Sequence, residues 1–344
     1  MNNKELSDLI NIYTDKICQG LPEWNYSGAE KNAEIQKQKK RFIEKMDTLK
    51  KSEVASVTEA LRAMDLIVAG YVPDEHIQIR VNGEDGRAAD LSKYANLKYK
   101  IPPKEKNNVI FSGEAFDQEK KFVFKTKGKQ KYQANVLVAT IRKRTRTVGV
   151  VAADSFLIQM GDEKTRNKAD KVADYVLKQS QKWDDIIFDF RGNGGGDATL
   201  IKQIGERLSG KKLKYADKIE IIGNREEEDG PPDRYFQKPK DKTFSGNVYV
   251  LQDRGNSSAA DGAIWMLRQM DNCQTIGENT YGAFAGGGVQ KHKMKEGILL
   301  MGNTYRERTM PNGDKVKEGK GIPPDIRCDS KKAYAKALNL IENK

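Results

Sequence analysis

An apolar segment that ends in a run of glycines most constrains how this chain folds. Residues 183–190 read Trp-Asp-Asp-Ile-Ile-Phe-Asp-Phe, and residues 191–196 read Arg-Gly-Asn-Gly-Gly-Gly. The apolar run predicts a buried strand, and the glycines predict a turn at its end. Because glycine has no Cβ, the backbone N–H groups of such a turn can approach a ligand closely. The segment therefore predicts a turn that binds an oxyanion or a phosphate.

A second segment predicts a strand, a turn and a helix in succession. Residues 248–252 are strand-like, residues 253–262 read Asp-Arg-Gly-Asn-Ser-Ser-Ala-Ala-Asp-Gly, and an apolar helical stretch follows. Ser257 and Ser258 lie at the junction, where a helix N-terminus exposes a hydroxyl and the amide that follows it. Taken alone, a serine at this place is a helix cap.

Two further motifs complete a pattern. Residues 277–282 read Gly-Glu-Asn-Thr-Tyr-Gly, and residues 318–325 read Glu-Gly-Lys-Gly-Ile-Pro-Pro-Asp. In order and spacing, the four motifs resemble those of the tail-specific (C-terminal processing) serine peptidases, over roughly residues 146–328. The resemblance implies an α/β protein with a crotonase-like twisted-sheet peptidase core.

The resemblance also implies a nucleophile. The family places its serine before Ala-(Ser/Ala)-(Glu/Asp), and Ser258-Ala259-Ala260-Asp261 fits this frame, whereas Ser257 falls one place early. In the best-known branch a lysine after Thr-Tyr-Gly is the base, but here Ala283 stands in its place. The chain is similar instead to the histidine-using branch, which includes the tricorn protease core and the chlamydial protease-like activity factor.

The chain has two histidines, His76 and His292. His76 opens a predicted strand and resembles the Asp-x-His segment of the histidine-using branch, so we expect it to be the general base. His292 lies in an alternating basic stretch that favours a solvent-facing strand, and we expect the adjacent lysines to lower its pKa. It is the second candidate.

Glu318 stands where the histidine-using branch carries its third catalytic residue. A carboxylate there would orient the imidazole and stabilise its cation; by composition alone, Glu318 is an exposed loop residue. For the oxyanion hole we expect the amides of Ala259 and of the Gly194-Gly195 turn. Arg191 and Asn193 are interpreted as the scaffold of that turn. The sequence leaves two alternatives for Asp189: it pairs with Arg191, or it faces solvent.

Composition agrees with an enzyme that has a substantial core. The 344 residues are 37% hydrophobic, without a run of membrane-spanning length. Three scattered cysteines and two histidines predict no metal, no cofactor and no disulfide framework. The net charge of +12 is spread among 49 acidic residues without an RNA-binding signature, so we expect no nucleic-acid partner. The expected partner is a peptide or protein substrate, and a homo-oligomer is left open.

The amino end lacks the apolar region of a signal peptide. As the sequence stands, it predicts a cytoplasmic protein, or a periplasmic or secreted one if an export signal has been removed.

Periodicity divides the chain into four segments. We expect an N-terminal helical unit at 1–70, a β-rich segment carrying His76 at 71–145, an α/β peptidase core at 146–328, and a C-terminal helix at 329–344. Within the β-rich segment, strands are expected near 109–111, 121–125 and 134–141. Many relatives insert a peptide-binding PDZ module before the core, but its glycine loop is not recognisable in residues 71–145.

Two functions of different class remain open. The first is a serine endopeptidase that acts through an acyl-enzyme on Ser258, with His76 as base and Glu318 orienting it. The second is a catalytically inactive homologue that serves as a ligand-binding or scaffold protein, since loss of the lysine is compatible with both. The serine, the glycine turn and Glu318 favour the enzyme, whereas the fold alone does not decide between them.

Overall fold

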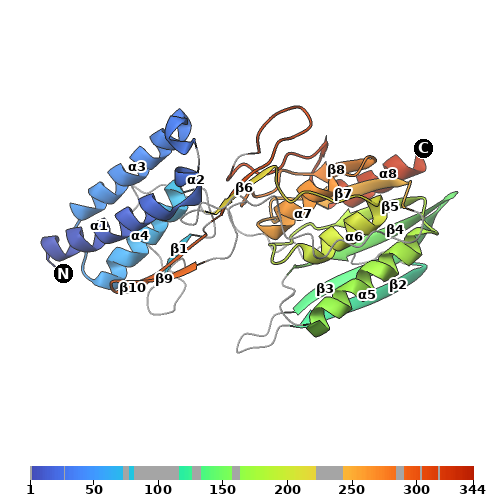
Figure 1. Cartoon of the computed structure of the whole chain (residues 1–344), viewed down its shortest axis with the longest axis horizontal. Helices are drawn as coiled ribbons and strands as arrows, with labels where there is room; N and C mark the ends of the chain where they lie inside the picture. The colour runs from blue at the N-terminus through green and yellow to red at the C-terminus, as the bar shows by residue number, and fades with distance from the viewer. Residues whose placement is uncertain are drawn as a thin grey trace. The chain divides into compact units, whose positions relative to one another are not determined.

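A computed structural model describes most of the chain (Figure 1). The described residues are 2–26, 28–72, 77–80, 116–125, 133–156, 163–221, 243–283, 290–302, 304–316 and 318–344. The strand expected near 109–111 lies outside them, as does His76. None of the helices in the described ranges is long and apolar enough to cross a membrane.

The chain forms two compact units, each built from separate stretches of sequence. Unit 1 contains Met1–Pro103, Lys218–Glu228 and Ala283–Glu307, and unit 2 contains Lys104–Asp217, Asp229–Gly282 and Arg308–Lys344. The predicted four segments follow chain order, whereas these units combine stretches that are distant in sequence. β6 (Lys218–Ile221) pairs with β11 (Thr304–Glu307) rather than with the sheet of unit 2.

Unit 1 is built from amphipathic helices and short antiparallel strands. Its elements are α1 (Asn3–Gly20), α2 (Pro22–Asn25), η1 (Ala29–Lys31), α3 (Ala33–Lys50), α4 (Val57–Tyr71), the β6–β11 pair, and a sheet of β1 (Gln78–Arg80), β10 (Gly297–Met301) and β9 (Gln290–Met294). Asn2 and Glu5 form a capping box that starts α1. The apolar faces of α1, α3 and α4 share one buried core with Ile79 and Leu299. The buried carboxylate of Asp65 on α4 accepts the amide of Ile79, which ties the helices to β1.

Unit 2 contains a seven-stranded mixed sheet in the order β12-β8-β7-β5-β4-β3-β2. The strands are β12 (Ile326–Arg327), β8 (Cys273–Gly277), β7 (Asn247–Gln252), β5 (Asp185–Asp189), β4 (Arg146–Ala153), β3 (Gln133–Lys143) and β2 (Gln118–Lys125). The strands from β12 to β4 are parallel, and β3 and β2 extend the sheet antiparallel. The central parallel strands β4, β5 and β7 are almost completely buried, as expected for a sheet with helices on both faces.

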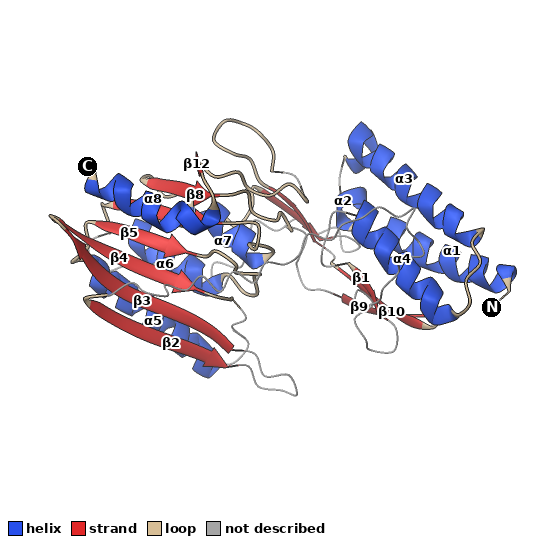
Figure 2. Cartoon of the chain, turned by 180° about the vertical axis from the view of Figure 1, so that it is seen from behind, coloured by secondary structure: helices blue, strands red, loops and turns tan. Residues whose placement is uncertain are grey.

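Four helices cover this sheet. α8 (Ser330–Glu342) packs on one face with a core that includes Val150, Tyr249 and Leu251. The other face carries α5 (Glu163–Ser180), α6 (Thr199–Ser209) and α7 (Ala259–Leu267), as Figures 1 and 2 show from opposite sides. Since both faces are closed, the loops at the strand ends are the places where side chains can meet a substrate.

Candidate active site

Three loops meet at the carboxyl edge of the parallel strands in unit 2. β5 runs into the glycine turn, β7 runs into the turn that carries Ser258, and β8 runs into residues 278–282. Asp189 of β5 pairs with Leu251 of β7, and Leu251 pairs with Ile276 of β8, so the three strands end at one level. The parallel sheet thus brings together three loops, at 191–196, 253–262 and 278–282, that are separate in the sequence.

Ser258 has a strained backbone at the start of α7. Its φ of 56° and ψ of −121° lie where side-chain-bearing residues are rare. A serine held this way between a strand and a helix is the geometry of a nucleophile elbow, which presents the hydroxyl at the sheet edge. The amide of Ala259 follows at the helix N-terminus and, among the described residues, has no hydrogen-bond acceptor. Strain of this kind indicates a functional position and not a simple helix cap.

The neighbouring serine has a structural contact. The hydroxyl of Ser257 donates to the carbonyl of Gly194 at 3.0 Å, and its amide donates to the carbonyl of Asn193 at 3.4 Å. Ser257 therefore joins the turn that carries Ser258 to the glycine turn. Its hydroxyl is buried in that contact, whereas Ser258 occupies the strained position.

Gly195 comes very close to the turn that carries Ser258. A Cβ at Gly195 would lie 2.6 Å from the Ser257 carbonyl oxygen, 2.9 Å from the Ala259 nitrogen and 2.9 Å from the Ser258 Cβ. Gly195 also has a φ of +98°. Only glycine satisfies both demands, and its backbone thereby lies beside the first amide of α7.

This crowding predicts a specific cost for Gly195→Ala. The φ alone should cost about 1–3 kcal/mol, and the backbone clashes should add to it because backbone cannot move aside as a side chain can. Gly313→Ala is the matched control in the same unit, with a φ of +86° and no atom within 4 Å of its added Cβ. Denaturant unfolding of both variants checks this. Equal losses of stability would show that Gly195 is not crowded.

The scaffold predicted for the glycine turn is confirmed. Asp189 accepts two hydrogen bonds from the Arg191 guanidinium, with an ion pair of 2.6 Å, so it does not face solvent. Burial opposes the charged guanidinium, but the hydrogen bond and charge of Asp189 outweigh it and raise the pKa of Arg191. Asn193 donates to the carbonyl of Ala153 and accepts the amide of Gly195. The Gly195 amide is therefore engaged within the turn.

Two further residues join the turns, and the sequence did not single them out. One oxygen of Asp253 accepts the amides of Gly192 and Gly255, both at 2.9 Å. The side-chain Nδ2 of Asn256 donates to the carbonyls of Phe190 and of Asn193 in the glycine turn. The only signal for this role was the occurrence of Asp and Asn within a turn, which is common and unspecific.

The loop that contains Glu318 is attached to the same edge. The amide of Gly319 donates to the carbonyl of Gly282, and the amide of Gly282 donates to the carboxylate of Asp261 on α7. The amide of Tyr281 donates to the carbonyl of Asn256, in the turn that carries Ser258. Glu318 is half-buried. The structure thus brings Glu318, Ser258 and the glycine turn into one connected set of loops within unit 2.

The two histidines belong to unit 1. His76 lies outside the described residues, just before Ile77 and β1. His292 is on β9, opposite Leu299 of β10, and is half-buried. Its pKa is lowered as expected, but the cause differs: burial is the main one, and the like charge comes from Lys16 of α1 rather than from the adjacent lysines. Strand neighbours point to opposite faces, which keeps Lys291 and Lys293 away from the ring.

A strained serine between a strand and a helix, beside a glycine turn on a covered α/β sheet, defines the class of serine hydrolases. The chain belongs to peptidase family S41, whose family model matches residues 147–328. Its class is therefore that of the serine peptidases, which act on peptide or protein substrates.

Solved structures show the same fold. Mature CPAF in complex with lactacystin is 11% identical, covers 99% of this chain and 98% of its own, and has a TM-score of 0.64. A candidate peptidase from Parabacteroides merdae ATCC 43184 is 15% identical, with coverage of 99% and 97% and a TM-score of 0.60. No curated protein sequence matches. The predicted α/β, crotonase-like peptidase core with an N-terminal helical unit is confirmed.

Proposed function

We propose that this chain is a serine endopeptidase in which Ser258 is the nucleophile, His76 the general base and Glu318 the residue that orients the base. The observation that carries the proposal is the backbone of Ser258, with its φ of 56° at the start of α7. Strain at a buried turn persists only where the surrounding structure enforces it, and it clusters at functional sites. The contacts of Ser257 and Gly195 enforce it here.

The reaction proceeds in two halves. His76 removes the hydroxyl proton of Ser258 while the oxygen attacks the peptide carbonyl carbon, and the imidazolium then gives this proton to the leaving amine as the C–N bond breaks. Water, deprotonated by His76, attacks the resulting ester and releases the second product with the hydroxyl restored. Glu318 accepts the other ring proton of His76 and stabilises its cation.

Backbone amides bind the oxyanion that forms when Ser258 attacks the peptide carbonyl. Ala259 supplies one amide from the first turn of α7, where the helix dipole adds positive potential. The Gly194-Gly195 turn supplies the other, and because the Gly195 amide donates to Asn193, we assign the role to Gly194. Gly195, which has no Cβ, allows the glycine turn to lie close to the turn that carries Ser258. Each such donor typically lowers the barrier by about 3 kcal/mol.

A second candidate function is a catalytically inactive scaffold, which the alanine at position 283 favours because it replaces the lysine of the best-known branch. Labelling of the wild-type protein with a fluorescent fluorophosphonate over a range of pH separates the two. An enzyme takes the label at a rate that increases as the base loses its proton. Well-folded protein that takes no label at any pH would establish the scaffold instead.

Glu318→Gln should slow acylation by about 10²- to 10⁴-fold, because the amide keeps the shape but neither fixes the tautomer of His76 nor stabilises its cation. The second-order rate of fluorophosphonate labelling measures this loss. Glu119→Gln on the exposed face of β2 is the matched control and should label at the wild-type rate. If Glu318→Gln also labelled at that rate, Glu318 would be an ordinary loop residue.

A further inference from the structure

We propose that Gln252 is a positioning residue, which holds the loop of Glu318 against the nucleophile turn. This inference rests on the proposed function, since it gives Gln252 an effect on the reaction through Glu318. Gln252 is the last residue of β7, directly before the turn that leads to Ser258. Its side chain is completely buried.

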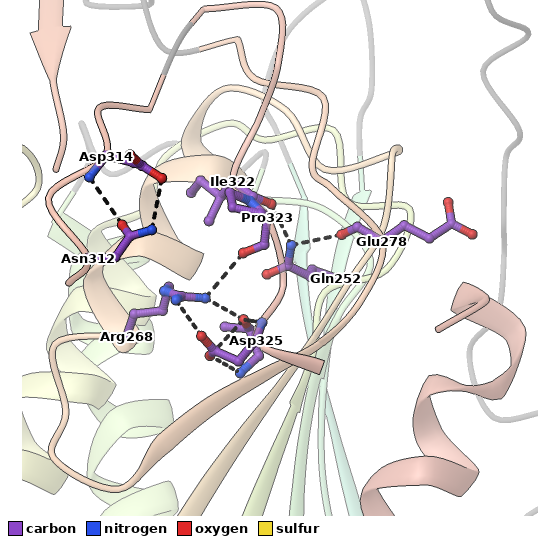
Figure 3. Close-up of polar contacts among 9 residues, drawn as sticks. Gln252, Arg268, Glu278, Asn312, Asp314, Ile322, Pro323 and Asp325 are labelled. Carbon is purple, nitrogen blue, oxygen red and sulfur yellow. Dashed lines mark hydrogen bonds and ion pairs between the residues drawn. The ribbon is translucent and has the colours of Figure 1, made fainter. Parts of the chain in front are cut away.

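The carboxamide of Gln252 spans two loops. Its nitrogen donates to the carbonyl of Glu278 and to the carbonyl of Ile322, both at 2.8 Å. Figure 3 shows the side chain between these two residues. The side-chain nitrogen of Gln252 thus bonds both loops: Glu278 belongs to the motif at 277–282, and Ile322 belongs to the motif at 318–325, which begins with Glu318.

The two loops also bind one another where Gln252 meets them. The amide of Thr280 donates to the carbonyl of Ile322, and the Thr280 hydroxyl accepts the amide of Ile322 at 2.8 Å. The Ile322 carbonyl therefore accepts from both Thr280 and Gln252. Four residues before Ile322 stands Glu318, and the intervening Gly319 is bonded to Gly282. The position of Glu318 is set by this group of bonds.

The far end of the loop is anchored separately. Arg268, at the C-terminal end of α7, contacts Asp325 at 2.6 Å and donates to the carbonyl of Pro323, and Asp325 accepts the amide of Thr275 (Figure 3). One side of residues 320–325 lines an open hollow of about 630 Å³. Near Ile322 the loop is bonded to Thr280 and to Gln252, away from this anchor.

Other side chains could not easily replace Gln252. A carboxylate at position 252 would face two carbonyl oxygens, and an aliphatic group would leave both carbonyls without this donor in a buried region. Gln252 is followed at once by Asp253, which holds Gly192 and Gly255. The residue thus connects Glu318 to the rest of the proposed site.

Gln252→Met tests the inference, because methionine has nearly the same length and lacks both donors. Gln203→Met is the control: Gln203 is a buried glutamine on α6 of the same unit. We expect the maximal rate of fluorophosphonate acylation to fall by about 10²-fold in Gln252→Met with unchanged probe affinity, because misplacement of about 1 Å has this effect. The control should keep its acylation rate.

A double variant separates positioning from general destabilisation. If Gln252 acts through Glu318, Gln252→Met combined with Glu318→Gln should be no slower than Glu318→Gln alone. The inference would be overturned if the losses of acylation rate in the two single variants multiplied in the double variant, or if Gln252→Met were acylated at the wild-type rate.

Hydrogen exchange tests the structural part without any activity. In Gln252→Met, the amides of Gly319 and Ile322 should exchange about tenfold faster or more, while those of β4 and β5 keep their protection. Unchanged exchange at Gly319 and Ile322 would overturn the inference even in an active enzyme. A wild-type protein that takes no label would instead overturn the proposed function, and exchange would then decide alone whether Gln252 holds the loop.

Discussion

Ser258→Ala is expected to abolish covalent labelling by a fluorophosphonate and to lower peptide hydrolysis by about 10⁶-fold, the usual effect of removing a serine nucleophile. No other hydroxyl replaces it, because Ser257 is one residue away but has its hydroxyl on the Gly194 carbonyl. Labelling followed by gel fluorescence and intact mass measures the first effect. If Ser258→Ala were still labelled at the wild-type rate, another residue would be the nucleophile.

Ser257→Ala is the matched control for this experiment. It removes one hydrogen bond to the glycine turn, which costs about 1 kcal/mol of stability, and leaves the hydroxyl of Ser258 in place. We therefore expect Ser257→Ala to be labelled at a somewhat reduced rate. Ser258→Gly adds a second check: it also loses labelling, but relief of the strained φ should stabilise the protein by about 1 kcal/mol.

His76→Ala is expected to slow acylation by about 10⁴- to 10⁶-fold, because nothing else removes the proton of Ser258. In the wild type the rate should increase with pH, because the general base must be unprotonated to accept the proton of Ser258. In His76→Ala this dependence should disappear, and added imidazole should restore part of the rate. The pH profile of labelling measures both.

His292→Ala is the control, because it removes the other histidine. His292 is on β9 with Lys16 nearby, and burial lowers its pKa. We assign it a structural role rather than a catalytic one. We expect the variant to keep the wild-type pH profile. Wild-type rates in His76→Ala together with loss in His292→Ala would reverse the assignment of the base.

The chain order of elements around the proposed site was predictable, since each motif is local. The run at 185–190 predicted β5 and its glycine turn, and the segment at 248–262 predicted β7 and α7, because hydrophobic period and glycine act over a few residues. The interpretation of Arg191 and Asn193 as scaffold also held. The sequence did not predict that residues 283–307 belong to unit 1, because this depends on how their strands pair with strands from distant parts of the chain.

The choice between Ser257 and Ser258 rested on a family frame at the level of sequence, and the structure adds a physical distinction. The positive φ at Ser258 is enforced by the close approach of Gly195 and by the hydrogen bond of Ser257 to Gly194, each between residues 63 positions apart in the sequence. The roles of Asp253 and Asn256 arise in the same way. Neither could be inferred from the spacing of residues along the chain.

The amino-acid sequence by itself determined which strands are apolar, where glycine interrupts them, and which residues with reactive side chains follow. These properties depend on neighbours within one turn or one strand. Only the tertiary structure decided which serine is strained, which glycine amide is already engaged, and that Gln252 reaches both Glu278 and Ile322. The strain at Ser258 and the two bonds of Gln252 depend on contacts between loops, and these contacts exist only once the sheet has aligned residues from distant parts of the chain.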